Sequence, residues 1–248
     1  MPTEYAMMLD VYRNLGQDPS VFAESEVAHV VIHENEVVGA SLVPGLEVEP
    51  EQLSDGISLR IVLQEGVRIE KQVHMCFGVL PEEGMQRILL DVEIMERSSI
   101  DVLAHCVFPN AVNVTHKMDA VIKVSPGATY RYFERHAHGE SGGVHVVPRA
   151  QVHVGEDATF ETEFELVKGR VGKMTIDYET WCRSHATMQM VARVAGRADD
   201  RIEVREVAHL DGEDAAGVLL SRIAVKDEAY ADVYSEICLL YTSPSPRD

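Results

Sequence analysis

The segment FERHAHGESGG, Phe133 to Gly143, concentrates histidines, glutamates and glycines in one short stretch. Alternate side chains of a strand point to the same face, so Glu134, His136 and His138 would share a face if this segment is a strand. Imidazole nitrogens and carboxylate oxygens are ligands of Zn²⁺ and Fe²⁺ in proteins. The spacing therefore predicts a metal site that needs one more ligand from a neighbouring segment.

Two histidines upstream, His105 and His116, are the candidates for that further ligand. The alternative interpretation is a hydrogen-bonded polar strand face that leads into a turn at residues 139–143. The residues alone leave both interpretations open.

The cysteines are the other group with chemistry to offer: Cys76, Cys106, Cys182 and Cys238. They form no C-x-x-C pair and show no even spacing, which disfavours a zinc knuckle or a disulfide framework. Cys106 and Cys182 are candidates for thiolate binding of iron or sulfur, with buried inert thiols as the alternative. Cys106 follows His105 directly, but adjacent strand residues face opposite sides, so this is not a Cys–His pair by default.

The charge balance limits the classes of partner. The chain has 248 residues and a formal net charge of −19, with 46% hydrophobic residues. Such a charge repels phosphate backbones and anionic lipid, so we expect neither nucleic-acid nor membrane binding. The N-terminus lacks both a basic region and a hydrophobic signal core, and no apolar run is long enough to span a bilayer, so we expect a cytoplasmic protein.

The first part of the chain, residues 1–85, is predicted to form a small α/β segment. Apolar residues recur at helical spacing from Met7 to Leu15, ahead of Gly16. Val27–Val43 predicts a hairpin around Glu34, Pro44–Gly56 a polar connector, and Ile57–Leu80 two further strands.

Residues 86–237 repeat one pattern of alternating β-formers, a short polar turn, a small residue and renewed alternation. The small residues are Ser99, Ala128, Ala158, Ala186, Ala216 and Ala229, at intervals of 29, 30, 28, 30 and 13 residues. A near-constant period built from short strands is typical of a β-solenoid, in which each coil buries its inner face against its neighbours. A β-sandwich would not hold this register. We therefore expect a mostly β fold with a parallel β-helix core.

The last eleven residues, CLLYTSPSPRD (Cys238 to Asp248), can be encoded by the transposase end and adapter of a common sequencing-library chemistry. We expect residues 238–248 to be a read-through artefact and the natural chain to continue differently after Ile237.

Several stretches resemble the SufB/SufD family of iron–sulfur cluster assembly proteins, in its short archaeal and anaerobe form. They are VHMCFGVLPEEGMQRI, AHCVFPNAVNVTHKMDA, YFERHAHGESGGV, TEFELVKGRVGKMTIDYE and LLSRIAVKDEAYADVYSEI. The resemblance implies a right-handed β-helix that acts as a scaffold, not an enzyme, on which a transient iron–sulfur cluster is built. It also implies a SufC-type ABC ATPase as partner and a homo- or heterodimer formed through C-terminal coils. No G-x-x-x-x-G-K-[ST] motif is present, so ATP chemistry would belong to the partner.

One departure from the family pattern concerns His136. It stands where the better-known scaffolds are expected to have a cysteine, which puts sulfur acceptance at this position in doubt. The family's interface ligands and ATPase-docking helices would follow Ile237, so the resemblance assigns no cluster ligand to this chain. Cys106, Cys182 and Glu134 remain candidates for cluster binding, and His136, His138 and His105 for metal binding.

A different class of function is a β-solenoid enzyme that binds a metal or processes carbohydrate. Glu161, Glu163 and Glu165 alternate outward on a predicted strand, and paired carboxylates can cleave glycosidic bonds. Two observations disfavour this enzyme hypothesis. Aromatic residues are scarce, and Asp or Glu residues do not cluster at matching positions of successive coils.

Overall fold

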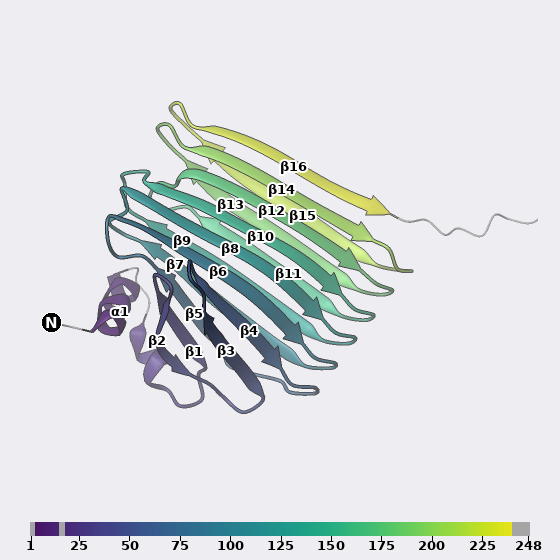
Figure 1. Cartoon of the computed structure of the whole chain (residues 1–248). Helices are drawn as coiled ribbons and strands as arrows, with labels where there is room; N and C mark the ends of the chain where they lie inside the picture. Colours follow the sequence, from purple (N-terminus) through teal and green to yellow (C-terminus); the bar gives the residue numbers. More distant parts are fainter. Residues whose placement is uncertain (1–2, 15–17, 240–248) are drawn as a thin grey trace, which may run out of the picture.

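The computed structural model describes residues 3–14 and 18–239, and these form a two-sheet solenoid with a short helical segment at its N-terminal end (Figure 1). The helices are α1 (Glu4–Asn14) and a 3₁₀ turn, η1 (Pro19–Ala23). The strands are β1 (His29–His33), β2 (Glu36–Ser41), β3 (Leu46–Gln52), β4 (Ile57–Leu63), β5 (Val73–Gly78), β6 (Glu83–Ile94), β7 (Ser99–Phe108), β8 (Asn113–Val124), β9 (Thr129–His138), β10 (Val144–Val154), β11 (Thr159–Leu166), β12 (Gly172–Cys182), β13 (Thr187–Gly196), β14 (Arg201–Leu210), β15 (Ala216–Val225) and β16 (Tyr230–Leu239). No helix in the described ranges has the length and apolar character needed to cross a membrane.

The described strands form two eight-stranded sheets, and from β4 onward successive strands alternate between them. Sheet A has the order β15-β13-β11-β9-β7-β5-β1-β2, and sheet B has the order β16-β14-β12-β10-β8-β6-β4-β3. Every pairing is parallel except those at the first edge, where β1 pairs with β2 and β3 with β4 antiparallel. The predicted parallel β-solenoid is confirmed. Parallel stacking already joins β4 to β6 and β5 to β7, so the expected boundary at residue 86 falls inside β6.

The inner faces of the two sheets meet in an apolar core. Burial alternates along β11, whose Phe160, Phe164 and Leu166 are buried while Glu161, Glu163 and Glu165 lie on the outer face. This period of two is what a sheet buried on one side requires. The outward placement of the three glutamates is confirmed.

The small residues of the repeat lie at the corners that lead from sheet B to sheet A. These corners are the turns 95–98, 125–128, 155–158, 183–186 and 212–215, each closed by a hydrogen bond from the fourth residue's N–H to the first residue's carbonyl. The third residue has a positive φ in all five turns: Arg97, Gly127, Asp157, His185 and Asp214. Ala128, Ala158 and Ala186 are almost fully buried because there is no room for a larger side chain where the backbone turns inward.

Three of the predicted repeat positions need correction. The equivalent corner residues are Ser98 and Ala215, one position before Ser99 and Ala216. Ala229 belongs to the opposite kind of corner, from sheet A to sheet B, where its N–H bonds to the Lys226 carbonyl. This explains the interval of 13, which measures half a coil.

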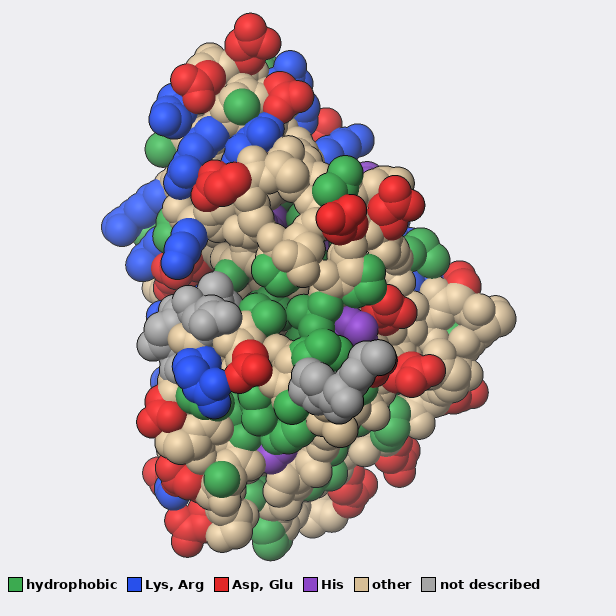
Figure 2. All heavy atoms as spheres, turned by 90° about the vertical axis from the view of Figure 1, so that its left-hand side faces the viewer, with side chains coloured by type: hydrophobic (Ala, Val, Ile, Leu, Met, Phe, Trp, Pro, Cys, Tyr) green, Lys and Arg blue, Asp and Glu red, His purple; other side chains and the backbone are tan. Residues whose placement is uncertain are grey.

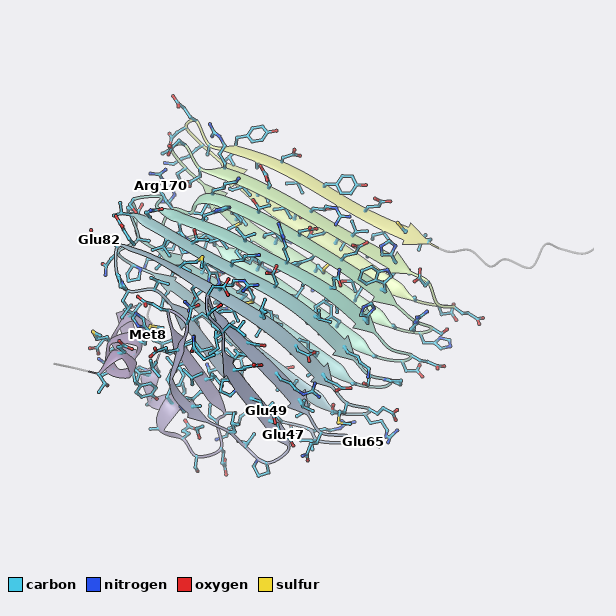
Figure 3. The ribbon with its side chains drawn as sticks, viewed as in Figure 1. Met8, Glu47, Glu49, Glu65, Glu82 and Arg170 are labelled. Atoms are coloured by element: carbon cyan, nitrogen blue, oxygen red, sulfur yellow. The ribbon has the colours of Figure 1, made fainter. Side chains whose placement is uncertain are left out.

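The expected connector from Pro44 to Gly56 is wrong, because it contains strand β3. Leu46 and Val48 face the core, while Glu47 and Glu49, which alternate with them, face solvent and can be seen along the lower edge in Figure 3. Pro50 disfavours a strand prediction from the sequence, but proline is tolerated here because β3 is the edge strand of sheet B. The predicted hairpin around Glu34 is confirmed as β1–β2.

The N-terminal helix packs on the outer face of sheet A. Met8 and Tyr12 of α1 join Phe22 in a second apolar cluster with Val31 and Cys76 of the sheet. This cover explains why β1 and β5 are buried on both faces. The predicted helix end near Leu15 and Gly16 lies outside the described residues.

Charged side chains form rows across the outer faces, one residue per coil. In sheet A, Arg131 lies between Asp101 and Glu161, at 3.3 Å and 3.1 Å from their carboxylate oxygens. In sheet B, Asp119, Arg149, Asp177 and Arg205 follow one another in register. Figure 2 shows Lys and Arg side chains gathered in the upper part of the face seen from the left of Figure 1.

Candidate metal centre

Four polar side chains from three strands meet inside the solenoid. Glu134 and His136 lie on the inner face of β9, and Cys106 is the register partner of His136 on β7. His116 reaches the same space from β8 in the opposite sheet. One potential ligand atom from each of the four lies within 4.8 Å of all the others, and no side chain is more than 5% exposed.

His138, one step further along β9, extends this cluster by a hydrogen-bond chain. Glu134 Oε1 lies 2.6 Å from His136 Nε2, and His136 Nδ1 lies 3.1 Å from His138 Nε2. His138 Nδ1 lies 3.1 Å from the carbonyl oxygen of Arg170. Figure 3 places Arg170 at the corner between β11 and β12.

The carbonyl at the end of this chain fixes where the protons sit. A carbonyl oxygen only accepts, so His138 Nδ1 donates to Arg170 and, in the neutral ring, Nε2 accepts. His136 Nδ1 must then donate to His138, which leaves its Nε2 as an acceptor. The donor to that nitrogen is a protonated Glu134 carboxyl.

Burial favours the same neutral state. It raises the pKa of Glu134, with nearby His116 opposing the shift, and it lowers the pKa of His136 to about 3. It also lowers the pKa of His138 well below its usual value, and raises that of the Cys106 thiol, which lies 3.5 Å from Glu134 Oε1. Without an ion the cluster therefore carries no net charge.

His116 is the least satisfied member of the group. It is fully buried, and neither ring nitrogen has a hydrogen-bond partner among the described residues. Burial, together with neighbouring His136, lowers its pKa to about 3. Glu134 Oε2 and the hydroxyl of Tyr132 are also buried without partners. Groups of this kind cost about 1–3 kcal/mol each if nothing binds them.

The structure thus brings together Glu134, His136, Cys106 and His116, with His138 behind them. His105 lies elsewhere: it faces the opposite side of β7 and packs edge-on against the Tyr12 ring of α1, with centroids 4.8 Å apart. The strand alternation that separates His105 from Cys106 is the physical reason.

The remaining cysteines also lie outside this cluster. Cys182 is fully buried at the end of β12, and burial raises the pKa of its thiol to about 12. Cys76 is buried beneath α1. Cys238 lies 3.2 Å from a carboxylate oxygen of Glu236 on β16.

A second buried carboxyl, that of Glu206 on β14, was not predicted from the sequence. It is 2% exposed and accepts a hydrogen bond from Ser221 at 3.1 Å. The signal was present, because Ile202, Val204 and Glu206 follow the two-residue period of the inner face.

A small cavity adjoins the cluster inside the solenoid. Its volume is about 30 Å³, and its lining includes Glu134 and the aromatic rings of Tyr130, Tyr132 and Tyr178. This is the space of about one water molecule, with polar atoms to bind it.

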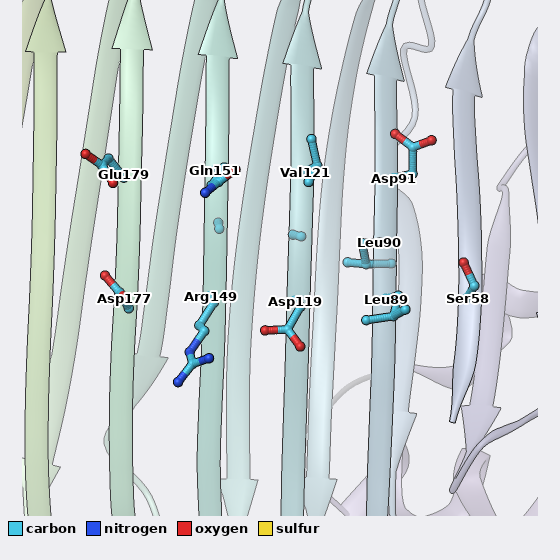
Figure 4. Close-up of a pocket in the computed structure, with 12 residues that line it drawn as sticks. Ser58, Leu89, Leu90, Asp91, Asp119, Val121, Arg149, Gln151, Asp177 and Glu179 are labelled. Carbon is cyan, nitrogen blue, oxygen red and sulfur yellow. The ribbon is translucent and has the colours of Figure 1, made fainter. Parts of the chain in front are cut away.

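A wider groove of about 550 Å³ runs over the outer face of sheet B (Figure 4). Asp119 and Asp177 occupy one row in it, two coils apart, with Arg149 between them. Because Arg149 occupies the coil between them, these two carboxylates do not lie at matching positions of successive coils, as the sequence predicts. Arg205 pairs with Asp177 at 2.7 Å, and His209 pairs with the neighbouring Glu179 at 2.8 Å.

Comparison with known proteins adds the decisive observation. No protein-family model matches the chain. An iron–sulfur cluster assembly SufBD family protein of Pyrococcus horikoshii is 28% identical over 233 residues, which are 94% of this chain and 71% of that protein. A protein of the same description from Methanocaldococcus jannaschii is 27% identical over 226 residues, 91% of this chain and 72% of its own length. The predicted resemblance to the SufBD family is confirmed. It extends over nearly the whole chain, so the coils that carry the buried cluster lie within the similar region.

Proposed function

We propose that this protein is a scaffold in iron–sulfur cluster assembly, not an enzyme, and that it works in the cytoplasm with a SufC-type ABC ATPase. The observation that carries this proposal is the similarity to two SufBD relatives along more than nine-tenths of the chain. Iron, sulfide and the transient cluster are cargo in this scheme.

The fold supports a scaffold role. A two-sheet solenoid holds its inward side chains in fixed rows, so groups from separate coils meet without any loop having to close over them. The buried cluster contains thiol, imidazole and carboxyl groups, which are the donor types that bind iron.

A dimer is the second part of the proposal. Among the described residues, β15 and β16 are the last strands of the two sheets, and their outer edges have unpaired backbone groups. Tyr230, Tyr234 and Ile237 of β16 are exposed by 40% or more. Exposed edges and large apolar side chains of this kind favour pairing with further strands, either of the continuing chain or of another chain. The dimer itself is proposed from the resemblance to the SufB/SufD family.

The test is anaerobic reconstitution of the purified protein with iron and sulfide, with and without the ATPase encoded in the same organism. We expect sulfide-to-iron charge-transfer absorption and transfer of the cluster to an apo-ferredoxin. We also expect the ATPase to co-purify with this protein. If neither cluster absorption nor ATPase binding is found, the scaffold proposal is wrong.

The alternative, a carbohydrate-processing solenoid enzyme, has one observation in its favour, the groove in which Asp119 and Asp177 share a row. Arg149 and Arg205 neutralise that row, whereas glycoside cleavage needs one carboxyl to remain protonated. Hydrolysis of acidic and neutral polysaccharides by wild type, abolished in Asp177→Asn, would favour the enzyme over the scaffold.

A further inference from the structure

We propose that Cys106, His116, Glu134 and His136 bind a single divalent transition-metal ion, Fe²⁺ or Zn²⁺, inside the solenoid. The inference rests on the donor set and its geometry, and it requires neither cluster assembly nor the ATPase.

The first argument is geometric. The ligand atoms come from both sheets and already lie within 4.8 Å of one another. Around a four-coordinate ion with bonds of about 2.0–2.3 Å, ligand atoms are about 3.3–3.8 Å apart. Binding therefore needs side-chain shifts of about an ångström, and no movement of the strands.

The second argument is the state of His116. A fully buried imidazole without any hydrogen-bond partner is costly, and an ion placed between it and the other three ligands would bind one of its two unpartnered nitrogens. Cys106, Glu134 and His136 lie on the opposite inner face, so one ion in the middle would contact all four.

The third argument is charge. Cys106 binds a metal as a thiolate and Glu134 as a carboxylate, so two protons leave when the ion enters. A divalent ion with these two anions and two neutral histidines has no net charge, which is the state that a buried site tolerates. Thiolate and imidazole ligands favour Fe²⁺ or Zn²⁺ over Mg²⁺ or Ca²⁺.

The fourth argument is the chain of hydrogen bonds that holds the His136 ring in place. His136 donates through Nδ1 to His138, which donates to the Arg170 carbonyl. His136 Nε2 accepts from the Glu134 carboxyl in the metal-free protein, and its lone pair becomes available to the ion once that carboxyl has lost its proton. Metal-binding histidines usually donate their other N–H in this way, which fixes the ring and its tautomer. Arg170 is itself held by Asp200, whose carboxylate oxygen lies 3.1 Å away.

The experiment uses the full chain, stripped of metal and kept anaerobic without sulfide. Co²⁺ serves as the spectroscopic probe, and Fe²⁺ and Zn²⁺ binding are measured by calorimetry and elemental analysis in excess Mg²⁺. Three variants remove ligands: Cys106→Ser, Glu134→Gln and His116→Leu. Two matched controls alter buried groups outside the cluster, Cys182→Ser and Glu206→Gln.

We expect one ion per chain, with thiolate-to-cobalt charge-transfer absorption in wild type and both controls. Cys106→Ser should lose that absorption, and each ligand variant should bind at least 10-fold more weakly. The proposal is overturned if wild type binds no ion, or if the controls lose binding as the ligand variants do. Failure to build a cluster, with Co²⁺ binding intact, would count against the proposed function alone.

Discussion

Glu134 Oε1 lies 2.6 Å from His136 Nε2 in the interior of the solenoid, where the glutamate is 2% exposed. A carboxyl that is usually ionised at neutral pH thus shares its proton with an imidazole in an apolar space. The pair adjoins Cys106 and the unpartnered His116, so a cation that displaces the shared proton would meet a carboxylate, a thiol and two imidazoles in one place.

The first prediction concerns His116 in the metal-free protein. Replacing it with leucine removes two buried nitrogens that have no partner, so His116→Leu should raise the free energy of unfolding by about 1 kcal/mol. His138→Leu is the matched change on a histidine with both nitrogens bonded, and it should lower that free energy by about 2 kcal/mol. Urea unfolding of both variants checks the contrast, and equal destabilisation would contradict it.

The second prediction is the pH dependence of the metal-free protein. The folded-state pKa values of His116 and His136 are about 3, so between about pH 6.5 and pH 3 the unfolded chain binds protons that the folded chain does not. The free energy of unfolding should therefore fall as pH falls, by up to about 1.4 kcal/mol per pH unit for each such proton. Glu134 has the opposite sign, because its raised pKa removes stability as pH rises above about 4.5.

Urea unfolding of wild type and His116→Leu at pH 7, 6 and 5 measures this dependence. The slope in the variant should be smaller by up to the contribution of one proton. An identical slope would mean that His116 is not held neutral in the folded protein.

The third prediction concerns the helix over sheet A. The Tyr12 ring packs against Phe22 with centroids 5.0 Å apart, and its hydroxyl lies 3.4 Å from His74 Nδ1. Tyr12→Ala should cost about 3 kcal/mol. It should also expose Cys76, which α1 covers, to alkylation while Cys106 stays protected. Mass spectrometry of alkylated peptides measures this, and equal labelling of both cysteines would show that the change is not local to α1.

The fourth prediction concerns the corner beneath Arg170. Gly172 has a φ of +82°, and a Cβ there would overlap the carbonyl oxygen of Gly142. Gly66, with a φ of +71°, has open space around it and is the matched control. Gly66→Ala should cost about 1 kcal/mol for its backbone conformation alone, whereas Gly172→Ala should cost at least about 3 kcal/mol. Thermal unfolding checks the difference, and similar melting temperatures would contradict it.

The sequence was informative where the two-residue period was clear. It predicted that Glu134, His136 and His138 share a face and that His105 and Cys106 do not, because strand alternation is a local property. It could not decide which face was interior, nor that His116 approaches from the other sheet, because that depends on how the two sheets pack. His105 was therefore an equal candidate until α1 was seen to cover it.

Strand β3 was missed because its composition is atypical of a strand. Its alternation is present in LEVEPEQ, but glutamates and Pro50 give it the composition of a turn. Only the position of β3 at the sheet edge makes that composition acceptable. The corner residues Ser98 and Ala215 were missed by one position because a small residue also follows each of them.

The charged rows on the outer faces restrict how the number of coils can change in evolution. Solenoids can in principle gain or lose whole coils. Here, deletion of the coil that carries Arg131 would bring Asp101 and Glu161 into neighbouring positions, where two negative charges repel. A shortened chain would have to fold against that repulsion. The alternating charges therefore disfavour the loss of a single coil from this part of the solenoid.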